Sequence, residues 1–188
     1  NTSEPLNPNP KDFPEMFPPE GLKDVVAIAA GYRGKAEDGR HVLALRADGS
    51  VVAWGKDTRS QCKLPQPVTD AVSVAAGGGY SAILRATGEA LAWGGSYSAA
   101  VKAPVAGEKI VQIVSGTTHL LFLTESGRVF ISGEDSKLKT QEWKLPKRAV
   151  AIGAHQYHVV VCLEDGSLWQ WGDHARPGTT PVPVKEGA

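Results

Sequence analysis

The chain repeats one pattern at a fixed interval, and this periodicity constrains its fold more than any other feature. A glycine that closes a turn and a glycine that ends the following strand recur every 39 residues, at Gly49, Gly88, Gly127 and Gly166 and at Gly55, Gly94, Gly133 and Gly172. A period of about 20 to 50 residues marks an array of small units, none of which can bury its hydrophobic face alone. We therefore expect four copies of one unit that stack against their neighbours.

Each copy carries the signals of three consecutive β-strands. In the first copy these are residues 25–31, 41–45 and 50–55. Gly49 marks the hairpin turn between the second and third, because glycine readily adopts the positive φ that such turns need. First strands end in small residues and third strands carry bulky ones, so each unit is a wedge, and wedges arranged around an axis form a β-propeller. We also expect a short outer fourth strand near Leu64-Pro65 and near Leu145-Pro146.

Columns of equivalent residues predict which aromatic side chains are buried. Trp54, Trp93 and Trp171 share one column of the third strands and are expected in the core, whereas the third copy has Ser132 there. Trp143 lies outside the strand columns. We expect it to be an exposed contact residue.

The same alignment gives expectations for the first strands and the cysteines. Period-2 alternation places the two β-branched residues of each first strand, such as Val72 and Val74, on one face. Cys162 takes a column otherwise filled by leucine and is expected to be a small buried residue. Cys62 lies in a connecting segment and is expected to be exposed, and Trp169 is expected to pack between blades. Two cysteines without CxxC spacing predict no disulfide framework.

Several of these segments carry a family resemblance. Residues 26–31, 41–45 and 48–55, followed by Gln61 and Pro65, resemble the repeat of the regulator of chromosome condensation family. The likeness extends from residue 25 to about 184 and is close to the short bacterial version, which is also similar to propeller-type β-lactamase inhibitor proteins. It implies a seven-bladed propeller that binds a protein partner through loops on one face.

The predicted fold class is all-β, with β-propeller blades built from four 39-residue repeats that form a partial, open propeller or part of a larger one. Three arrangements stay open: a segment of a longer propeller, an open arc completed by another chain, and a closed four-blade ring. We favour the first two, because a ring of this family needs more units. An open arc exposes apolar faces at its terminal blades, which oligomerisation or neighbouring sequence should cover.

The repeat also sets the expected domain limits. Residues 1–24 are rich in proline and predict an extended arm or linker, which we hypothesise caps an exposed blade through Phe13, Met16 and Phe17. The first blade carries an insertion within residues 32–40, predicting a longer polar loop. Residues 25–188 form the four-blade array, with blades at about 25–70, 71–109, 110–148 and 149–188.

The charge balance argues against two classes of partner. Twenty basic and twenty acidic residues cancel, which removes the basic surface expected of a dedicated nucleic-acid binder or a protein on an anionic membrane. No apolar run approaches the ~20 residues of a membrane span, and no charged-then-apolar leader opens the sequence. These features do not fix the compartment, and we lean only toward a secreted or cell-surface bacterial protein.

No motif of catalysis stands out: the sequence contains no nucleophile elbow, Walker loop or HExxH. We therefore expect a non-enzymatic protein without cofactor or metal ion. His41, His119 and His158 share a column, but equivalent positions in neighbouring blades lie about 10 Å apart, whereas Zn–N bonds are about 2 Å. These imidazoles are expected to have a structural role, each hydrogen-bonded to the backbone of its own or the adjacent blade. His155 and His158 have HxxH spacing, and we expect them on opposite faces.

Family usage places the contacts in loops just before the second strand and just after the third. Tyrosine and arginine are favoured there, because they bury area and still form hydrogen bonds. The partner is expected to be a protein of unknown identity, such as a secreted enzyme inhibited by the chain, and self-association could complete the ring. The alternative is a carbohydrate-binding or adhesin-associated surface module. The predicted partner-binding residues are Tyr32, Arg33, Arg40, Tyr97, Thr118, Gln156 and Tyr157.

Overall fold

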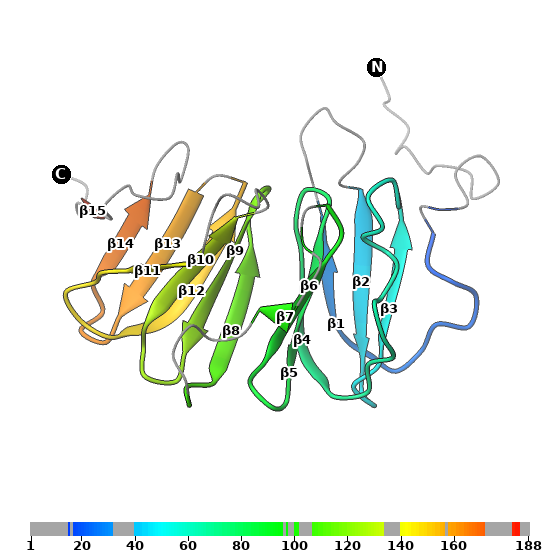
Figure 1. The fold of residues 1–188 in the computed structure, drawn as a ribbon, viewed down its shortest axis with the longest axis horizontal. Coiled ribbons are helices and arrows are strands. Elements are labelled where there is room, and N and C mark those ends of the chain that lie inside the picture. Colours follow the sequence, from blue (N-terminus) through cyan, green and yellow to red (C-terminus); the bar gives the residue numbers. More distant parts are fainter. Residues whose placement is uncertain are drawn as a thin grey trace, which may run out of the picture.

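The computed structural model is all-β. It describes residues 15, 17–31, 40–95, 97, 100–101, 107–133, 140–156, 158–171 and 182–184. Within these residues the strands form four small antiparallel sheets, and none is shared between sheets (Figure 1). The described ranges contain no helix long and apolar enough to cross a membrane.

Each sheet is one blade, and the blades follow one another along the chain. The order within a sheet is sequential, so strands that are neighbours in a sheet also follow one another in the chain. Blade 1 contains β1 (Val25–Ala30), β2 (His41–Arg46) and β3 (Val51–Gly55); blade 2 contains β4 (Ala71–Ala76), β5 (Ser81–Arg85), β6 (Ala90–Trp93) and β7 (Ala100–Val101); blade 3 contains β8 (Ile110–Ser115), β9 (His119–Thr124), β10 (Val129–Gly133) and β11 (Gln141–Trp143); blade 4 contains β12 (Ala149–His155), β13 (His158–Leu163), β14 (Leu168–Trp171) and β15 (Val182–Pro183). These sheets confirm the predicted propeller blades, while the exact domain limits stay a prediction.

The expected fourth strands are partly right. Blade 3 ends in β11, which lies just before Leu145. In blade 1, however, residues 56–70 contain no strand, so the fourth strand expected near Leu64-Pro65 is wrong. Turn hydrogen bonds hold this segment instead, among them one from the Cys62 amide to the Asp57 carboxylate at 2.8 Å.

A β-bulge near the start of every first strand changes which residues share a face. The pairing register shifts at the same point in all four blades. A bulge inserts one unpaired residue and so breaks the alternation of side chains. In each blade the unpaired residue is a valine whose side chain is more than half exposed; these are Val26, Val72, Val111 and Val150. The β-branched residue two positions later is far less exposed in blades 2 to 4, where it is Val74, Ile113 and Ile152. The expectation that Val72 and Val74 share one face is therefore wrong.

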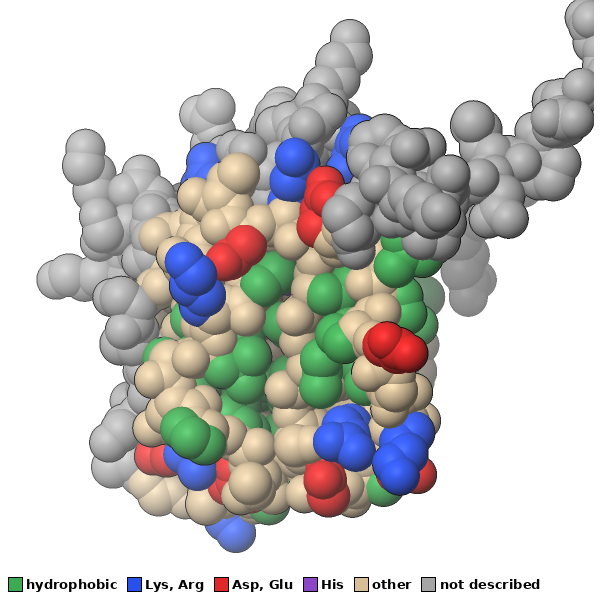
Figure 2. All heavy atoms as spheres, turned by 90° about the vertical axis from the view of Figure 1, so that its right-hand side faces the viewer, with side chains coloured by type: hydrophobic (Ala, Val, Ile, Leu, Met, Phe, Trp, Pro, Cys, Tyr) green, Lys and Arg blue, Asp and Glu red, His purple; other side chains and the backbone are tan. Residues whose placement is uncertain are grey.

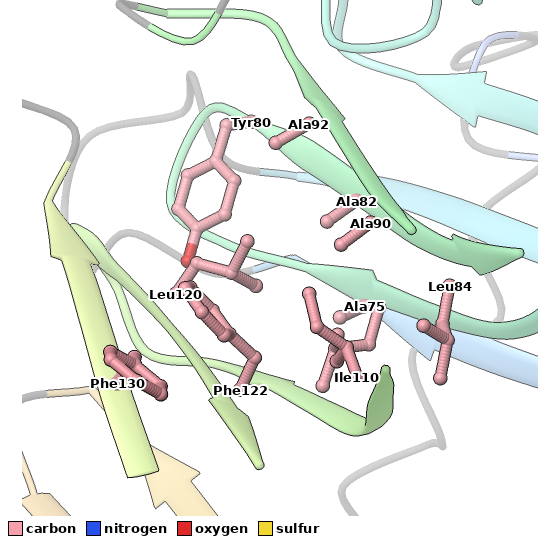
Figure 3. Close-up of a cluster of buried hydrophobic side chains, with 11 residues drawn as sticks. Ala75, Tyr80, Ala82, Leu84, Ala90, Ala92, Ile110, Leu120, Phe122 and Phe130 are labelled. Carbon is pink, nitrogen blue, oxygen red and sulfur yellow. The ribbon is translucent and has the colours of Figure 1, made fainter. Parts of the chain in front are cut away.

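The hydrophobic core consists of layers between successive blades. Each buried cluster combines one face of a sheet with the opposite face of the next sheet. Between blades 2 and 3, Tyr80 and Leu84 belong to the same cluster as Leu120 and Phe122, and the Tyr80 ring lies beside Leu120 (Figure 3). The small residues of blade 2 leave room for the Phe122 and Phe130 rings, which stack with centroids 5.6 Å apart. Stability therefore arises at blade junctions, as expected for repeat proteins.

The tryptophans define one of these junctions. Trp93 and Trp171 are buried, as predicted, but Trp54 is only half-buried because the described residues place no blade over its side of blade 1. The expectation of an exposed Trp143 is wrong. It lies in β11, is 5% exposed, and stacks on Trp171 with ring centroids 3.5 Å apart. Trp169 packs against the same cluster between blades 3 and 4.

Both cysteines are free and half-buried, so neither expectation for their exposure holds fully. Cys162 is less buried than predicted because its face of blade 4 is uncovered in the described residues. Cys62 is more buried than predicted, and its thiol donates to the Lys56 carbonyl at 3.5 Å. Burial raises the pKa of the Cys62 thiol to about 11, so this thiol is protonated at neutral pH.

Candidate protein-interaction rim

The antiparallel strands divide the molecule into two rims. Connections from first to second strands and segments after third strands lie at the same end of each sheet, because strand direction alternates. We call this end the loop rim; it includes residues 77–80, 116–118 and 155–156. The opposite end carries the hairpin turns at Gly49, Gly88, Gly127 and Gly166, and we call it the turn rim.

A chain of backbone hydrogen bonds runs along the loop rim across three blades. The Gly78 amide donates to the Thr117 carbonyl at 2.8 Å, and the Thr117 amide donates to the Gln156 carbonyl at 2.8 Å. Gln156 has φ of 48°, a left-handed conformation that residues other than glycine rarely adopt. Such conformations persist where the surroundings hold them, often at functional sites. The rim loops are thus fixed relative to one another.

Ring side chains at the start of the second strands form hydrogen bonds to the adjacent blade. His41 Nε2 lies 2.9 Å from the Ser81 hydroxyl of blade 2. The Tyr80 hydroxyl donates to the carbonyls of Gly116 and His119 in blade 3. The third member of the column, the His119 imidazole, packs directly against Gly116. A Cβ atom at position 116 would lie 2.2 Å from this ring. His41 and Tyr80 therefore join adjacent blades, as a structural role requires, although the Ser81 partner of His41 is a side-chain hydroxyl and not the predicted backbone group.

His119 differs from the other members of its column. Its Nε2 atom is buried and has no hydrogen-bond partner within the described part of the chain. Burial lowers the pKa of His119 to about 4, because the charged form loses its hydration. The imidazole is therefore neutral at neutral pH, and it stays neutral in mildly acidic solution.

The two histidines with HxxH spacing lie opposite each other. His155 ends β12 and His158 begins β13, and the two are paired across the hairpin. Directly paired residues of antiparallel strands share a face, so the expectation of opposite faces is wrong. Among the described residues, no three His, Cys, Asp or Glu side chains come together to form a metal site.

The described members of the predicted binding set lie on the loop rim. Arg40 is exposed, and its carbonyl accepts a hydrogen bond from the Lys56 amide at 2.8 Å. Thr118 and Gln156 are half-buried in the loops of blades 3 and 4, and the bonds of Thr117 bring these two loops together. Tyr32, Arg33 and Tyr157 lie outside the described residues.

Tyr97 is already engaged in a blade junction. Its hydroxyl donates to the Ser132 carbonyl of blade 3 at 2.7 Å, and its ring lies 4.6 Å from that of Tyr80, measured between centroids. The side chain stays half-exposed. A partner at this position would meet a ring edge that packing has already ordered.

Two cavities open beside the rim. One of about 310 Å³ runs along the first strands and reaches Thr117, His155 and Gln156. A second of about 200 Å³ lies on blade 1 between Arg40 and Trp54. Gln156 thus borders a hollow that can accept a partner side chain, whereas the hollow beside Arg40 lies on the face of blade 1 that carries Val42 and Trp54.

The sequence analysis missed a pair of hydrogen bonds between a side chain of one inner strand and the backbone of the next; we call this pair the polar tie. Gln112 of β8 donates from Nε2 to the Ile152 carbonyl at 2.9 Å, and the Ile152 amide donates to Gln112 Oε1 at 3.0 Å. The equivalent residues are Ala27, Ser73 and Ala151. This break in a column of small residues is the signal that identifies the tie.

Charges on the turn rim are neutralised within the chain. Arg128 forms two hydrogen bonds to Glu142, at 2.6 and 2.9 Å, and Lys147 pairs with Asp165 at 2.9 Å. The Arg128 guanidinium lowers the pKa of Glu142 to about 2. These carboxylates and cations already satisfy one another, so they are poorly suited to recruit a charged partner.

Comparisons with known proteins support the fold. No protein-family model matches the chain, and no curated protein matches it in sequence. Among solved structures it is similar to Prp20p of Saccharomyces cerevisiae, with 21% identity and a TM-score of 0.68 over 87% of this chain and 50% of that one. Human WBSCR16 gives 19% identity and a TM-score of 0.66 over 86% and 53% of the two chains.

A plant receptor shows the same blades. The CRINKLY WD40 ectodomain of the Arabidopsis thaliana receptor kinase ACR4 gives 20% identity and a TM-score of 0.64, over 81% of this chain and 56% of that one. The chain thus spans about half the length of these structures. The chain shares the β-propeller fold of yeast RCC1 (Prp20) and WBSCR16, as the sequence predicted. The likeness to bacterial inhibitor proteins stays a prediction.

Proposed function

We propose that the chain is a non-enzymatic protein-interaction module that binds a protein partner through its loop rim. The observation that carries this proposal is the hydrogen-bonded chain from Gly78 through Thr117 to Gln156. It holds loops of three blades in one arrangement, and loops on a rigid scaffold are where binding residues concentrate. Pre-ordered loops also lose less conformational entropy on binding.

The structural neighbours support the general idea of a propeller used to bind proteins. Binding properties toward Gsp1p and histones are described for Prp20p, and yeast RCC1 (Prp20) has been solved bound to Kap60. These partners belong to those proteins. For this chain we infer only a protein partner, and inhibition of a secreted enzyme is a specific form of that proposal.

The residues proposed to contact the partner are those predicted from the sequence. Gln156 borders the cavity along the first strands, and Arg40 and Thr118 lie on the same rim in blades 1 and 3. Tyr97 contributes its exposed edge, and Arg40 offers a charged, adaptable anchor of the kind found in interface centres. Tyr32, Arg33 and Tyr157 belong to the same proposal.

Site-specific photocrosslinking tests which rim binds. A benzophenone amino acid at Thr118 should capture one discrete protein from the native source, whereas the same probe at Thr87, on the turn rim, should capture none. Arg40→Ala and Gln156→Gly should each reduce capture about tenfold, equal to about 1.4 kcal/mol. Glycine at position 156 keeps the left-handed backbone, so this variant removes only the side chain.

Two results would contradict the proposal. Equal capture from Thr118 and Thr87 would show that the loop rim has no special role. Selective binding to a glycan array that Arg40→Ala abolishes, with no protein captured, would favour the carbohydrate-binding alternative instead.

A further inference from the structure

Every described blade junction joins the same two kinds of face. The forward face of one sheet, defined as the face toward the next blade, packs on the backward face of the next sheet. In the first junction, Leu43 and Leu45 of blade 1 meet Ile83 and Leu91 of blade 2. In the last, Leu121 of blade 3 shares a cluster with several residues of blade 4. Each blade therefore carries two complementary apolar faces.

Blade 1 has no blade on its backward face within the described residues. Ile28 is 70% exposed there, although its equivalents Ile113 and Ile152 are 4% and 5% exposed. Val42 and Trp54 on the same face are half-buried. Figure 2 shows the side of the molecule on which β1–β3 lie in Figure 1, with hydrophobic side chains gathered at its centre and charged ones around them.

Within the described residues, blade 4 has no neighbouring blade on its forward face. Val160 is 39% exposed, whereas Leu43, Ala82 and Leu121 at the equivalent positions are fully buried. Leu168 is 44% exposed, although its equivalents in the other three blades are buried. The same columns are buried wherever the described residues place a blade next to them, so the exposure of both terminal faces reflects the absence of such a blade among these residues.

We propose that the forward face of blade 4 packs on the backward face of blade 1 in a second copy of the chain. Such a contact continues the junction already formed three times within the chain. When two chains each make it once with the other, a two-fold axis along the propeller axis relates the contacts and the assembly closes into a ring. The occupant of both faces is then another copy, which carries the complementary face by construction.

The size of the faces favours a closed ring over an open chain of copies. Three strands spaced about 4.8 Å apart and about five residues long cover roughly 240 Å². One junction hides two such faces, roughly 500 Å², and a ring of two chains hides about 1,000 Å² in its two junctions. A specific interface needs about 1,000 Å², so two junctions reach this size and one does not.

Sedimentation velocity over a range of concentrations tests the proposal with the full chain. The wild-type chain should sediment with twice the mass of one chain. Ile28→Lys on blade 1 and Val160→Lys on blade 4 should each raise the dissociation constant at least about tenfold, because each would place an unpaired ammonium in an apolar junction. Unchanged melting temperatures at low concentration verify that both variants still fold.

Val111→Lys is the matched control. Val111 is 52% exposed, like the tested residues, but it occupies the unpaired bulge position of an inner blade. This change should leave the dimer intact. An equal loss of dimer in this control would overturn the proposal.

Mixing the two variants tests the head-to-tail geometry. Neither variant alone can form an intact junction with itself, but the mixture can form one, from the forward face of Ile28→Lys and the backward face of Val160→Lys. The mixture should therefore dimerise more strongly than either variant alone and more weakly than the wild-type chain. A wild-type monomer, a mass that keeps growing with concentration, or loss of the dimer in only one of the two variants would overturn the two-chain ring.

Discussion

Inner and terminal blades share one sequence unit but differ in how much of it they bury. Trp93 in blade 2 and Trp54 in blade 1 occupy the same column, yet Trp93 is buried and Trp54 is half-exposed. Leu121 and Val160 differ in the same way between blades 3 and 4. The unit therefore does not determine its own burial. The neighbouring blade does, which places most of the stability of the array at its junctions.

The largest expected difference between inner and terminal blades is at the tryptophan column. Trp93→Ala should lower the free energy of unfolding by about 3–5 kcal/mol, because it empties a packed junction. The change also removes the hydrogen bond from Trp93 Nε1 to the Gln61 carbonyl, at 2.8 Å. Trp54→Ala should cost less than about half as much, since part of that ring is already in water. Urea denaturation at a concentration where the chain is monomeric measures both.

Equal losses in the two variants would contradict the comparison. They would mean that Trp54 is covered in solution by a segment of its own chain. The experiment therefore also tests the hypothesis that the proline-rich arm, through Phe13, Met16 and Phe17, caps a blade.

The second prediction concerns pH and the buried histidine of an inner blade. His119 has its pKa lowered to about 4 by burial, against about 6.5 in an unfolded chain. Below pH 6.5 the unfolded chain binds a proton that the folded chain does not, so the free energy of unfolding falls as the pH drops. Above pH 6.5 the contribution is constant. Between pH 6.5 and 4 the loss should reach about 3 kcal/mol.

A histidine variant sharpens this test. His119→Phe removes the titrating group while keeping a ring in the junction, so it should flatten the pH dependence over this range. If His119→Phe kept the full slope, burial of this imidazole would not be its origin.

The local features of the blades could be predicted from the sequence, because their causes are local. The turn at Gly49 and the strand from Val51 to Gly55 follow from residues next to one another in the chain. Repetition of these signals four times made the propeller fold predictable. The bulge after Ala71 could not be predicted in this way, because it depends on the pairing register between β4 and β5.

Features that depend on another blade were harder to predict. Trp143 was expected to be exposed because it falls outside the repeated columns, and only its stacking on Trp171 of the next blade explains its burial. On the rim, the alignment located Thr118 and Gln156 in the loops. It could not show that Thr117 ties these loops together, because this contact joins residues of different repeats.

The smallest predicted effect is at Gln112, which joins blades 3 and 4. Its side-chain amide forms one hydrogen bond to the Ile152 carbonyl and one to the Ile152 amide. Gln112→Ala should lower the free energy of unfolding by about 1 kcal/mol, because Gln112 is only half-buried and water can replace part of the lost hydrogen bonding. Ser73→Ala, the same column in blade 2, should change it by less than about 0.5 kcal/mol. Hydrogen exchange of the Ile152 amide should speed up in Gln112→Ala alone, and unchanged exchange there would mean that packing, not this polar tie, holds the last blade in place.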